Sequence, residues 1–310
     1  MLTKALWKLR RSRATLRFRE LVDAAVVRGR GSVSTGPQRC SATELKDDEG
    51  RIYPRTAWPT LLQTHFEALY ADAHQAPQHL WHAVKDFVPF SGGELASVFQ
   101  DLAYRHPNAS PGEQDMPYQF YAQAPAGVHD ALALELTARI QQPWQSPLTT
   151  AEMAMSEKRQ HPQGLRDYRP LVLLGSLWQG QDAALQQRQQ EAMDADVGPQ
   201  VMGFRKGYQA SEMTTVVSLA LERCKEWKEP LVLMKVDIEG AFDAVRWDEA
   251  LQATAAAGIA ADAHAMVREQ ASTPGVAMLD GATASFTKQR GVWQGATSSP
   301  RIFRSVKEKA

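Results

Sequence analysis

The residue of this chain with the clearest chemical potential is an aspartate that follows an apolar run. Leu231–Val236 has four consecutive apolar residues, then a lysine and a valine, which predicts a strand buried on both faces. Asp237 comes next, and Gly240 marks a turn. Mg²⁺ in proteins is bound by one or two carboxylates together with water and phosphate oxygens. A carboxylate at the end of such a strand is therefore a candidate metal ligand, although Asp237 considered alone fits a helix cap or a turn at least as well.

Helical patterns predict most of the elements around this segment. Apolar residues at helical spacing, bounded by serine, proline and glycine signals, predict helices over residues 58–71, 91–104, 128–141, 211–224 and 247–257. Ser91, with Glu94 three residues later, has the pattern of a capping box, so the second of these helices should begin there. Leu171–Leu174 is a short apolar run that fits a strand.

The composition is that of a globular protein. Apolar residues make up 44% and charged residues 23% of the 310 residues, enough for one large domain or two modest ones. Lys plus Arg and Asp plus Glu number 35 each, so the net charge argues neither for nor against a nucleic-acid partner. The first 31 residues carry nine basic and two acidic side chains. Residues 1–28 also resemble an imperfect amphipathic helix that would attract phosphate or an anionic surface; the alternative is an organellar transit peptide.

The cysteines and the hydropathy pattern argue against several classes. Cys40 and Cys224 lie far apart, without CxxC or Cys/His spacing, which disfavours a disulfide framework or a structural zinc site and suits a reducing compartment. No run of 18 apolar residues occurs, so no membrane span is predicted. We therefore expect an intracellular protein of the nucleus or cytoplasm. The sequence does not indicate its oligomeric state.

Several segments, taken in chain order, resemble motifs of the non-LTR (LINE-type) retrotransposon reverse transcriptases. Asp237–Asp243, which reads Asp-Ile-Glu-Gly-Ala-Phe-Asp, is similar to the first catalytic motif of that family, and Arg290–Phe303 is similar to the next. The upstream segments with such similarity are Leu45–Ile52 with Phe66 and Leu69–Tyr70, Ser110–Pro117, Asp167–Leu171 and Gly203–Gly207. The resemblance covers about residues 45–306. Single motifs of this kind are common by chance, so their shared order carries the assignment.

The resemblance implies an α+β fold with the right-hand arrangement of polymerases. Residues 1–40 would be a basic helical extension and linker, and residues 41–150 a mostly helical region that precedes the fingers. Residues 151–230 would form the fingers. Residues 231–310 would form an incomplete palm, an antiparallel sheet with packed helices, and the thumb would be absent.

The reaction implied is nucleotidyl transfer. The 3′-oxygen of a DNA primer, paired to an RNA template, attacks the α-phosphorus of a deoxynucleoside triphosphate (dNTP), and two Mg²⁺ ions stabilise the attacking and leaving oxygens. By resemblance, Asp237 is one metal ligand and the backbone carbonyl of Ile238 a second. Arg205 and Lys206 would contact template phosphates, with an ordinary charged loop as the alternative.

The resemblance also implies side chains that bind the dNTP. Arg169 would meet the triphosphate through its planar guanidinium, and Lys158 would do the same, although a solvated surface lysine fits that position too. Phe242 would lie under the sugar and reject a 2′-hydroxyl; the alternative is a core phenylalanine at a helix start. Gln294 and Gly295 would line the nucleotide pocket, where a small residue allows the backbone to approach substrate.

The family has residues that this chain lacks. Its [FY]xDD hairpin is expected some tens of residues after Gln294, but the sixteen residues that follow Gln294 include no aspartate. Trp293, Ala296 and Arg301 stand where the family usually has arginine, aspartate and an apolar residue. We therefore expect a truncated domain with an incomplete metal site that does not polymerise DNA, and the sequence leaves open whether the chain is an enzyme. The alternatives are a non-catalytic RNA-binding remnant and a group II intron-type maturase reverse transcriptase.

Overall fold

The structure is a computed structural model that describes residues 44–46, 51–109, 116–158, 162, 164–198, 201–205 and 207–309. Its helices are α3 (Trp58–Leu69), α4 (Gly92–Arg105), α5 (Tyr118–Ala122), α6 (Ala126–Gln141), α7 (Ser176–Ala195), α8 (Ala210–Trp227), α9 (Trp247–Ala257), α10 (Ala260–Ser272) and α11 (Ser299–Lys309). Its strands are β1 (Leu45–Lys46), β2 (Ile52–Tyr53), β3 (Ala151–Glu157), β4 (Tyr168–Leu173), β5 (Gly275–Leu279) and β6 (Ala282–Phe286). This mixture confirms the α+β class. The predicted basic extension (residues 1–40), most of Ser110–Pro117, and Lys206 lie outside the described residues.

The main sheet has four strands in the order β4–β3–β5–β6. β3 pairs antiparallel with β4, and β5 pairs antiparallel with β6. β3 and β5 run parallel, with Ala151 opposite Gly275 and Met153 opposite Ala277. The two strands within residues 231–310, β5 and β6, thus pair antiparallel, whereas the sheet as a whole is mixed. A parallel pair needs a long crossover connection, and the chain between β3 and β5, which includes α7 to α10, supplies it.

One face of this sheet is buried under α3. Buried and less buried residues alternate along β3 and β5, as expected for strands with one packed face. Phe66 and Tyr70, at the C-terminal end of α3, stack on Phe286 of β6 with ring centroids 4.9 and 5.7 Å apart. Stacked aromatic rings contribute about 0.5–1.5 kcal/mol beyond the area they bury. These contacts fix α3 against the sheet.

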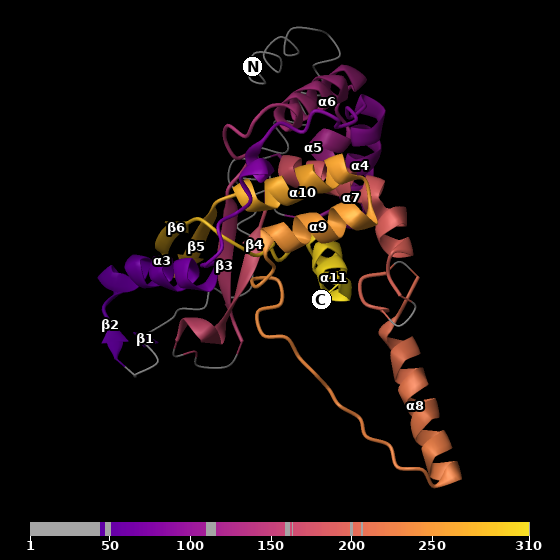
Figure 1. The fold of residues 1–310 in the computed structure, drawn as a ribbon. Helices are drawn as coiled ribbons and strands as arrows, with labels where there is room; N and C mark the ends of the chain where they lie inside the picture. The colour runs from indigo at the N-terminus through magenta and orange to yellow at the C-terminus, as the bar shows by residue number, and fades with distance from the viewer. Residues whose placement is uncertain are drawn as a thin grey trace.

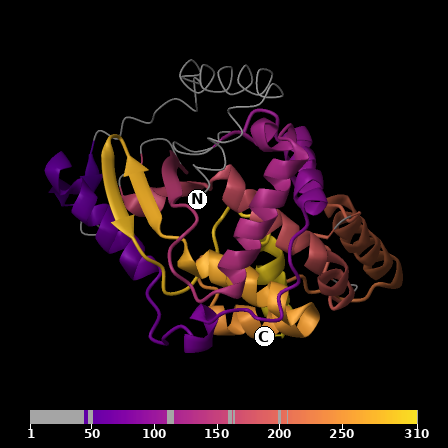
Figure 2. The same cartoon turned by 90° about the horizontal axis from the view of Figure 1, so that it is seen from above.

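The remaining packed helices form a second layer with its own core. Figures 1 and 2 show the sheet and α3 on one side of the molecule, with helices α4 to α7, α9 and α10 gathered on the other. Buried side chains of α4, α6, α7 and α10 meet in this core. α4 and α7 approach closely at Gly180, where an added Cβ would lie 2.3 Å from the ring of Phe99. A side chain larger than hydrogen has no room there.

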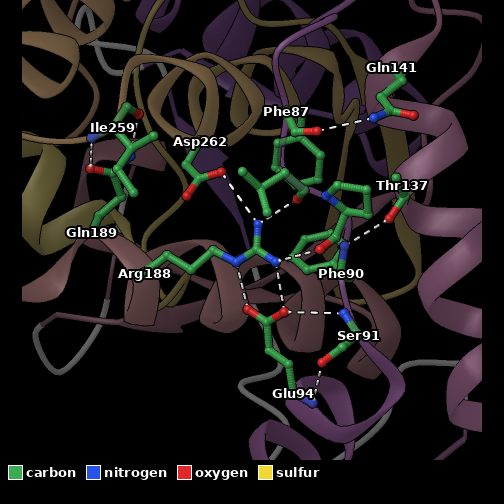
Figure 3. A network of polar contacts seen from close by, with 12 residues as sticks. Phe87, Phe90, Ser91, Glu94, Thr137, Gln141, Arg188, Gln189, Ile259 and Asp262 are labelled. Carbon is green, nitrogen blue, oxygen red and sulfur yellow. Dashed lines mark hydrogen bonds and ion pairs between the residues drawn. The ribbon is translucent and has the colours of Figure 1, made fainter.

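Arg188 on α7 links this helix to α4, to the residues just before α4 and to α10 (Figure 3). The Arg188 guanidinium donates to both carboxylate oxygens of Glu94, at 2.6 and 2.7 Å, and to the carbonyl oxygens of Val88 and Pro89. It also lies 3.5 Å from a carboxylate oxygen of Asp262 on α10. A two-pronged arginine–carboxylate pair fixes orientation as well as distance. Arg188 therefore ties α4, α7 and α10 together.

Several sequence-based predictions of helices are confirmed. α3, α6 and α9 coincide with the predicted helices to within two residues at each end. The Ser91 hydroxyl accepts from the Glu94 N–H at 3.1 Å, and a Glu94 carboxylate oxygen accepts from the Ser91 N–H, so α4 begins with the predicted capping box. The helix predicted from Ser211 begins one residue earlier, and the residue that precedes it, Gln209, makes no side-chain cap.

The prediction of a buried strand over Leu231–Val236 is wrong. The segment has no strand structure and is exposed, with Val232 88% and Met234 83% accessible to solvent. Figure 1 shows α8 projecting from the body of the molecule and this segment returning from its far end. A strand is buried only when other strands pair with its edges and side chains cover its faces, and within the described ranges no element does either for residues 231–236.

Candidate nucleotide site

Two of the motif-like segments lie against each other in the structure. The Val292 N–H donates to the Phe242 carbonyl oxygen at 2.9 Å, and the Gly291 N–H donates to the Val245 carbonyl oxygen at 2.6 Å. Gly291 has a φ of +88°, and a Cβ there would lie 3.0 Å from the Asp243 carbonyl oxygen. Glycine is therefore required both by the left-handed backbone and by the close approach. The two segments are joined by backbone hydrogen bonds, so their relative position is fixed.

The loop continues to β4, the strand that carries Arg169. Gly295 has a φ of +107°, and a Cβ there would lie 3.1 Å from the Val172 carbonyl oxygen. The Gln179 side-chain amide donates to the Gly295 carbonyl oxygen at 3.0 Å. Gln294, one residue earlier, is half-buried. Gly295 thus brings the loop next to the strand that begins in the Asp167–Leu171 motif.

A buried carboxylate occupies the junction of these segments. Asp243 is 8% exposed and accepts a hydrogen bond from the Tyr70 hydroxyl at 3.0 Å. The side-chain amide nitrogen of Gln294 lies 3.5 Å from each of its carboxylate oxygens. Burial raises the pKa of Asp243 above the ordinary aspartate value, while the hydrogen bonds from Tyr70 and Gln294 and the charges of Lys288 and Lys158 act in the opposite direction.

A buried cation, Lys288, also acts on this carboxylate. Lys288 donates to the Gly291 carbonyl oxygen at 3.1 Å, and its Nζ lies 3.7 Å from the centre of the Trp293 ring. Burial lowers the pKa of Lys288 well below the ordinary lysine value, and the charge of Asp243 opposes this shift. The ring face of Trp293 and the charge of Asp243 both favour a cation at this place.

The other residues expected to bind the dNTP lie on the Phe242 segment, on β4 and just after β3, and their contact with a nucleotide stays a prediction. Phe242 is half-buried and stacks on Phe303 with ring centroids 5.5 Å apart. Arg169 is exposed on β4. Lys158 is exposed just after β3, where its ammonium donates to the Arg166 carbonyl oxygen at 2.9 Å.

The expected template residue Arg205 has partners within its own loop. Its guanidinium donates to the Gly198 and Val201 carbonyl oxygens, at 3.3 and 3.4 Å, and lies 4.5 Å from the centre of the Tyr208 ring. Arg205 therefore holds this loop together, and its contact with a template stays a prediction.

Comparison with known proteins identifies the region that contains this junction. Residues 157–310 match the sequence model of a known family, described as "Reverse transcriptase (RNA-dependent DNA polymerase)". This part of the chain is a reverse transcriptase domain. No curated protein matches the sequence significantly. Reverse transcriptases act on a nucleic-acid template and primer with dNTPs, and they generally use divalent metal ions such as Mg²⁺.

Asp237 and Ile238 of the reverse transcriptase domain lie on the exposed segment after α8. The Asp237 side chain accepts a hydrogen bond from the Ile238 N–H at 3.1 Å. Across the described ranges of the chain, no group of three or more His, Cys, Asp or Glu residues could hold a metal ion. The donors at Asp237 thus do not fit a two-metal site among these residues.

Within the same ranges, no helix is long and apolar enough to cross a membrane.

A second buried polar network lies beneath the loop of the reverse transcriptase domain. Asp182 on α7 accepts from the Ser298 N–H at 2.9 Å and from the Ser298 hydroxyl at 2.6 Å. The Gln270 side-chain amide donates to the Ser298 hydroxyl oxygen and accepts from the Trp293 N–H at 2.9 Å. Burial raises the pKa of Asp182 to about 6. These contacts anchor the chain on both sides of Gln294.

Sequence reasoning missed several residues of this arrangement. Tyr70 entered only as part of a weak motif, and Asp243 only as the last letter of a stronger one. Lys288 and Asp182 gave no local signal, because an isolated lysine or aspartate is ordinarily exposed. Their roles depend on contacts between residues far apart in the sequence.

The exposed apolar side chains of residues 231–236 would be buried if two copies of the chain met there, and this can be tested. Replacing Val232 and Met234 together with lysine is expected to weaken any self-association that this segment mediates on the order of a hundredfold, since each such side chain contributes about 1.5–3 kcal/mol when it becomes fully buried. The melting temperature should not change, because both side chains are exposed. Sedimentation velocity over a concentration series measures the effect.

Leu134→Lys on α6 is the matched control, because Leu134 is also an exposed apolar residue, 74% accessible. It should leave self-association unchanged. Equal weakening by Leu134→Lys, or no weakening by the double variant, would show that residues 231–236 are not a specific site of self-association.

Proposed function

We propose that residues 157–310 derive from the RNA-directed DNA polymerase of a non-LTR (LINE-type) retrotransposon. Residues 151–230 would correspond to fingers and residues 231–310 to a palm. The observation that carries the proposal is the junction at Asp243, where the loop that holds Gln294 is bonded to the Phe242 segment and touches β4. Three segments that resemble family motifs, distant in sequence, converge there.

The junction suggests how these side chains would act on a nucleotide. Arg169 on β4 and Lys158 just after β3 are exposed cations that would suit the triphosphate oxygens. Gln294 and Gly295 would line the sugar and base, where glycine lets the backbone come close. Phe242 would stand at the sugar. Holding a nucleotide in one orientation is itself a large part of catalysis in phosphoryl transfer.

We further propose that the 310-residue chain does not extend a primer by itself. Bound Mg²⁺ would supply charge stabilisation to the attacking and leaving oxygens. Asp237, the residue implied to hold it, is exposed on an extended segment whose apolar side chains face solvent. Such a segment needs neighbouring strands before its carboxylate has a fixed place.

Primer extension tests this proposal. The 310-residue chain is mixed with an RNA template, a labelled DNA primer, dNTPs and Mg²⁺ or Mn²⁺, and extension is followed on a gel. We expect no incorporation. Incorporation that disappears in Asp237→Ala would contradict the inactive assignment and support a working metal site at that residue.

RNA binding without incorporation would favour the non-catalytic RNA-binding reading over a maturase reverse transcriptase. In that case affinity should fall steeply with salt, since phosphate contacts release counterions.

A further inference from the structure

The Asp243 carboxylate is contacted by residues that lie far apart in the sequence. It meets the hydroxyl of Tyr70, the residue that closes α3, and the amide of Gln294 in the loop. Tyr70 is 2% exposed and lies outside residues 157–310. The ring of Tyr70 is itself fixed, because it stacks on Phe286 and meets the edge of Trp293. A buried hydroxyl in a packed ring gives Asp243 a partner that cannot swing away.

Lys288 is a buried cation whose charge favours the ionised form of Asp243. It is 5% exposed, sits over the Trp293 ring, and lies 5.9 Å from the centre of the Tyr70 ring. A buried carboxylate without a nearby cation would be costly, and a buried ammonium without an anion equally so. The charged or titratable groups that act on Asp243 are thus Tyr70 from α3, Lys288 from the chain after β6, and Lys158 from the end of β3.

The polarity of these contacts decides how Gln294 is presented. An ionised carboxylate only accepts hydrogen bonds, so the Gln294 group that faces it is the amide NH₂. The carbonyl oxygen of the same amide is then directed away from Asp243. A carbonyl oxygen accepts hydrogen bonds, so it suits a hydroxyl or amino group of a nucleotide and not its phosphates.

We propose that Asp243, held by the hydrogen bond from Tyr70, is a positioning residue that fixes the amide orientation of Gln294 at the nucleotide pocket. The nucleotide part of this proposal rests on the proposed function. Because Tyr70 belongs to α3, the helix ahead of the reverse transcriptase domain is then a structural part of the pocket. Gln294 is the residue that would touch substrate, and Asp243 acts through it.

The test observes the Gln294 side-chain amide directly. The full chain is labelled with ¹⁵N at glutamine side chains, and the Gln294 resonance is assigned as the one lost in Gln294→Ala. Its shift is followed over pH in the wild type, in Asp243→Asn and in Tyr70→Phe. Gln63, whose amide donates to Glu67 on the exposed side of α3, is the control in the same spectra.

In the wild type, the Gln294 amide resonance should shift with pH as Asp243 titrates. The midpoint should lie above the ordinary pKa of aspartate, because burial raises the pKa of Asp243. That transition should vanish in Asp243→Asn. In Tyr70→Phe it should move to higher pH, because the lost hydrogen bond stabilised the carboxylate. The Gln63 resonance should behave alike in all three proteins. A Gln294 resonance indifferent to both variants would overturn the proposal. Tyr70→Phe keeps the test valid if Asp243→Asn does not fold.

Adding dATP, with an RNA template–DNA primer duplex whose next template base pairs with it, separates the positioning role of Asp243 from the nucleotide site. A shift of the Gln294 resonance that is lost in Asp243→Asn supports both the positioning role and the nucleotide pocket. A resonance that follows Asp243 but ignores dATP upholds the link between these residues and counts against the nucleotide site of the proposed function.

Discussion

Replacing Arg188 with methionine is expected to lower the free energy of unfolding by about 3–5 kcal/mol, the usual cost of removing one partner from a buried ion pair. Methionine keeps the apolar stem but leaves the carboxylates of Glu94 and Asp262 without their cation. Asp262 is 2% exposed, so its charge would stay in an apolar surrounding. The Val88 and Pro89 carbonyl oxygens would lose their donor as well. Urea unfolding of the variant and the wild type measures the difference.

Arg105→Met is the matched control. Arg105 pairs with Asp101 one turn earlier on α4, and both side chains are largely exposed. Pairs of this kind contribute about 0.3–0.5 kcal/mol, so the control should unfold almost as the wild type does. Losses of similar size for Arg188→Met and Arg105→Met would contradict the role of Arg188 as the link between α4, α7 and α10.

Asp182 is expected to make the chain less stable as pH rises from about 4 to 7. Burial raises its pKa in the folded state to about 6, whereas the unfolded chain has the ordinary value of 3.8. The folded state therefore binds more protons over this range, so stability is fully present below pH 3.8 and is lost as pH rises through 6. The difference corresponds to about 3 kcal/mol, from two pKa units at roughly 1.4 kcal/mol each.

Asp182→Asn removes this titration and should remove that part of the pH dependence. Burial also raises the pKa of Asp262 and Glu269, and both residues remain in the variant. The quantity to compare is therefore the change in unfolding free energy between pH 4 and pH 7 in the two proteins. Wild type should lose about 2.4 kcal/mol more than the variant over this range, because part of the full effect is already lost at pH 4. Parallel pH profiles would show that Asp182 does not titrate in the folded protein.

Local sequence signals predicted the elements whose boundaries are set locally. Ser91 and Glu94 predicted the start of α4, because their side chains accept hydrogen bonds from N–H groups at the helix start, and this depends on local sequence alone. The β5–β6 hairpin carried a comparable signal, Asp280–Gly281, at φ angles of +48° and +86°, which suits a two-residue turn. That hairpin was not predicted, although its turn residues were readable.

The strand predicted over Leu231–Val236 failed for a different reason. Its residue types favour a strand, but strand formation depends on neighbours that supply hydrogen bonds and cover the faces. The parallel pairing of β3 with β5 is equally non-local, since it joins Met153 to Ala277 across most of the reverse transcriptase domain. No window of sequence contains both partners.

The candidate site divides in the same way. Phe242, Gln294 and Gly295 were named from motifs, and the structure brings their segments together through backbone hydrogen bonds. Tyr70 and Lys288 are recognised through contacts at long sequence separation, Tyr70 with Asp243 and Lys288 with the ring of Tyr70. Residues that resemble family motifs can be named from sequence, whereas the residues that orient them require the fold.

The most direct test of the account is the binding of an RNA template–DNA primer duplex by the 310-residue chain as a function of salt. Affinity should be measurable at low salt and fall steeply as salt rises. Arg205→Gln with Lys206→Gln, the two residues expected at the template phosphates, should weaken binding and reduce the salt slope by about one per lost phosphate contact. Arg105→Gln, on α4, should not. Absence of affinity at low salt would contradict both the polymerase-derived and the RNA-binding readings of this domain.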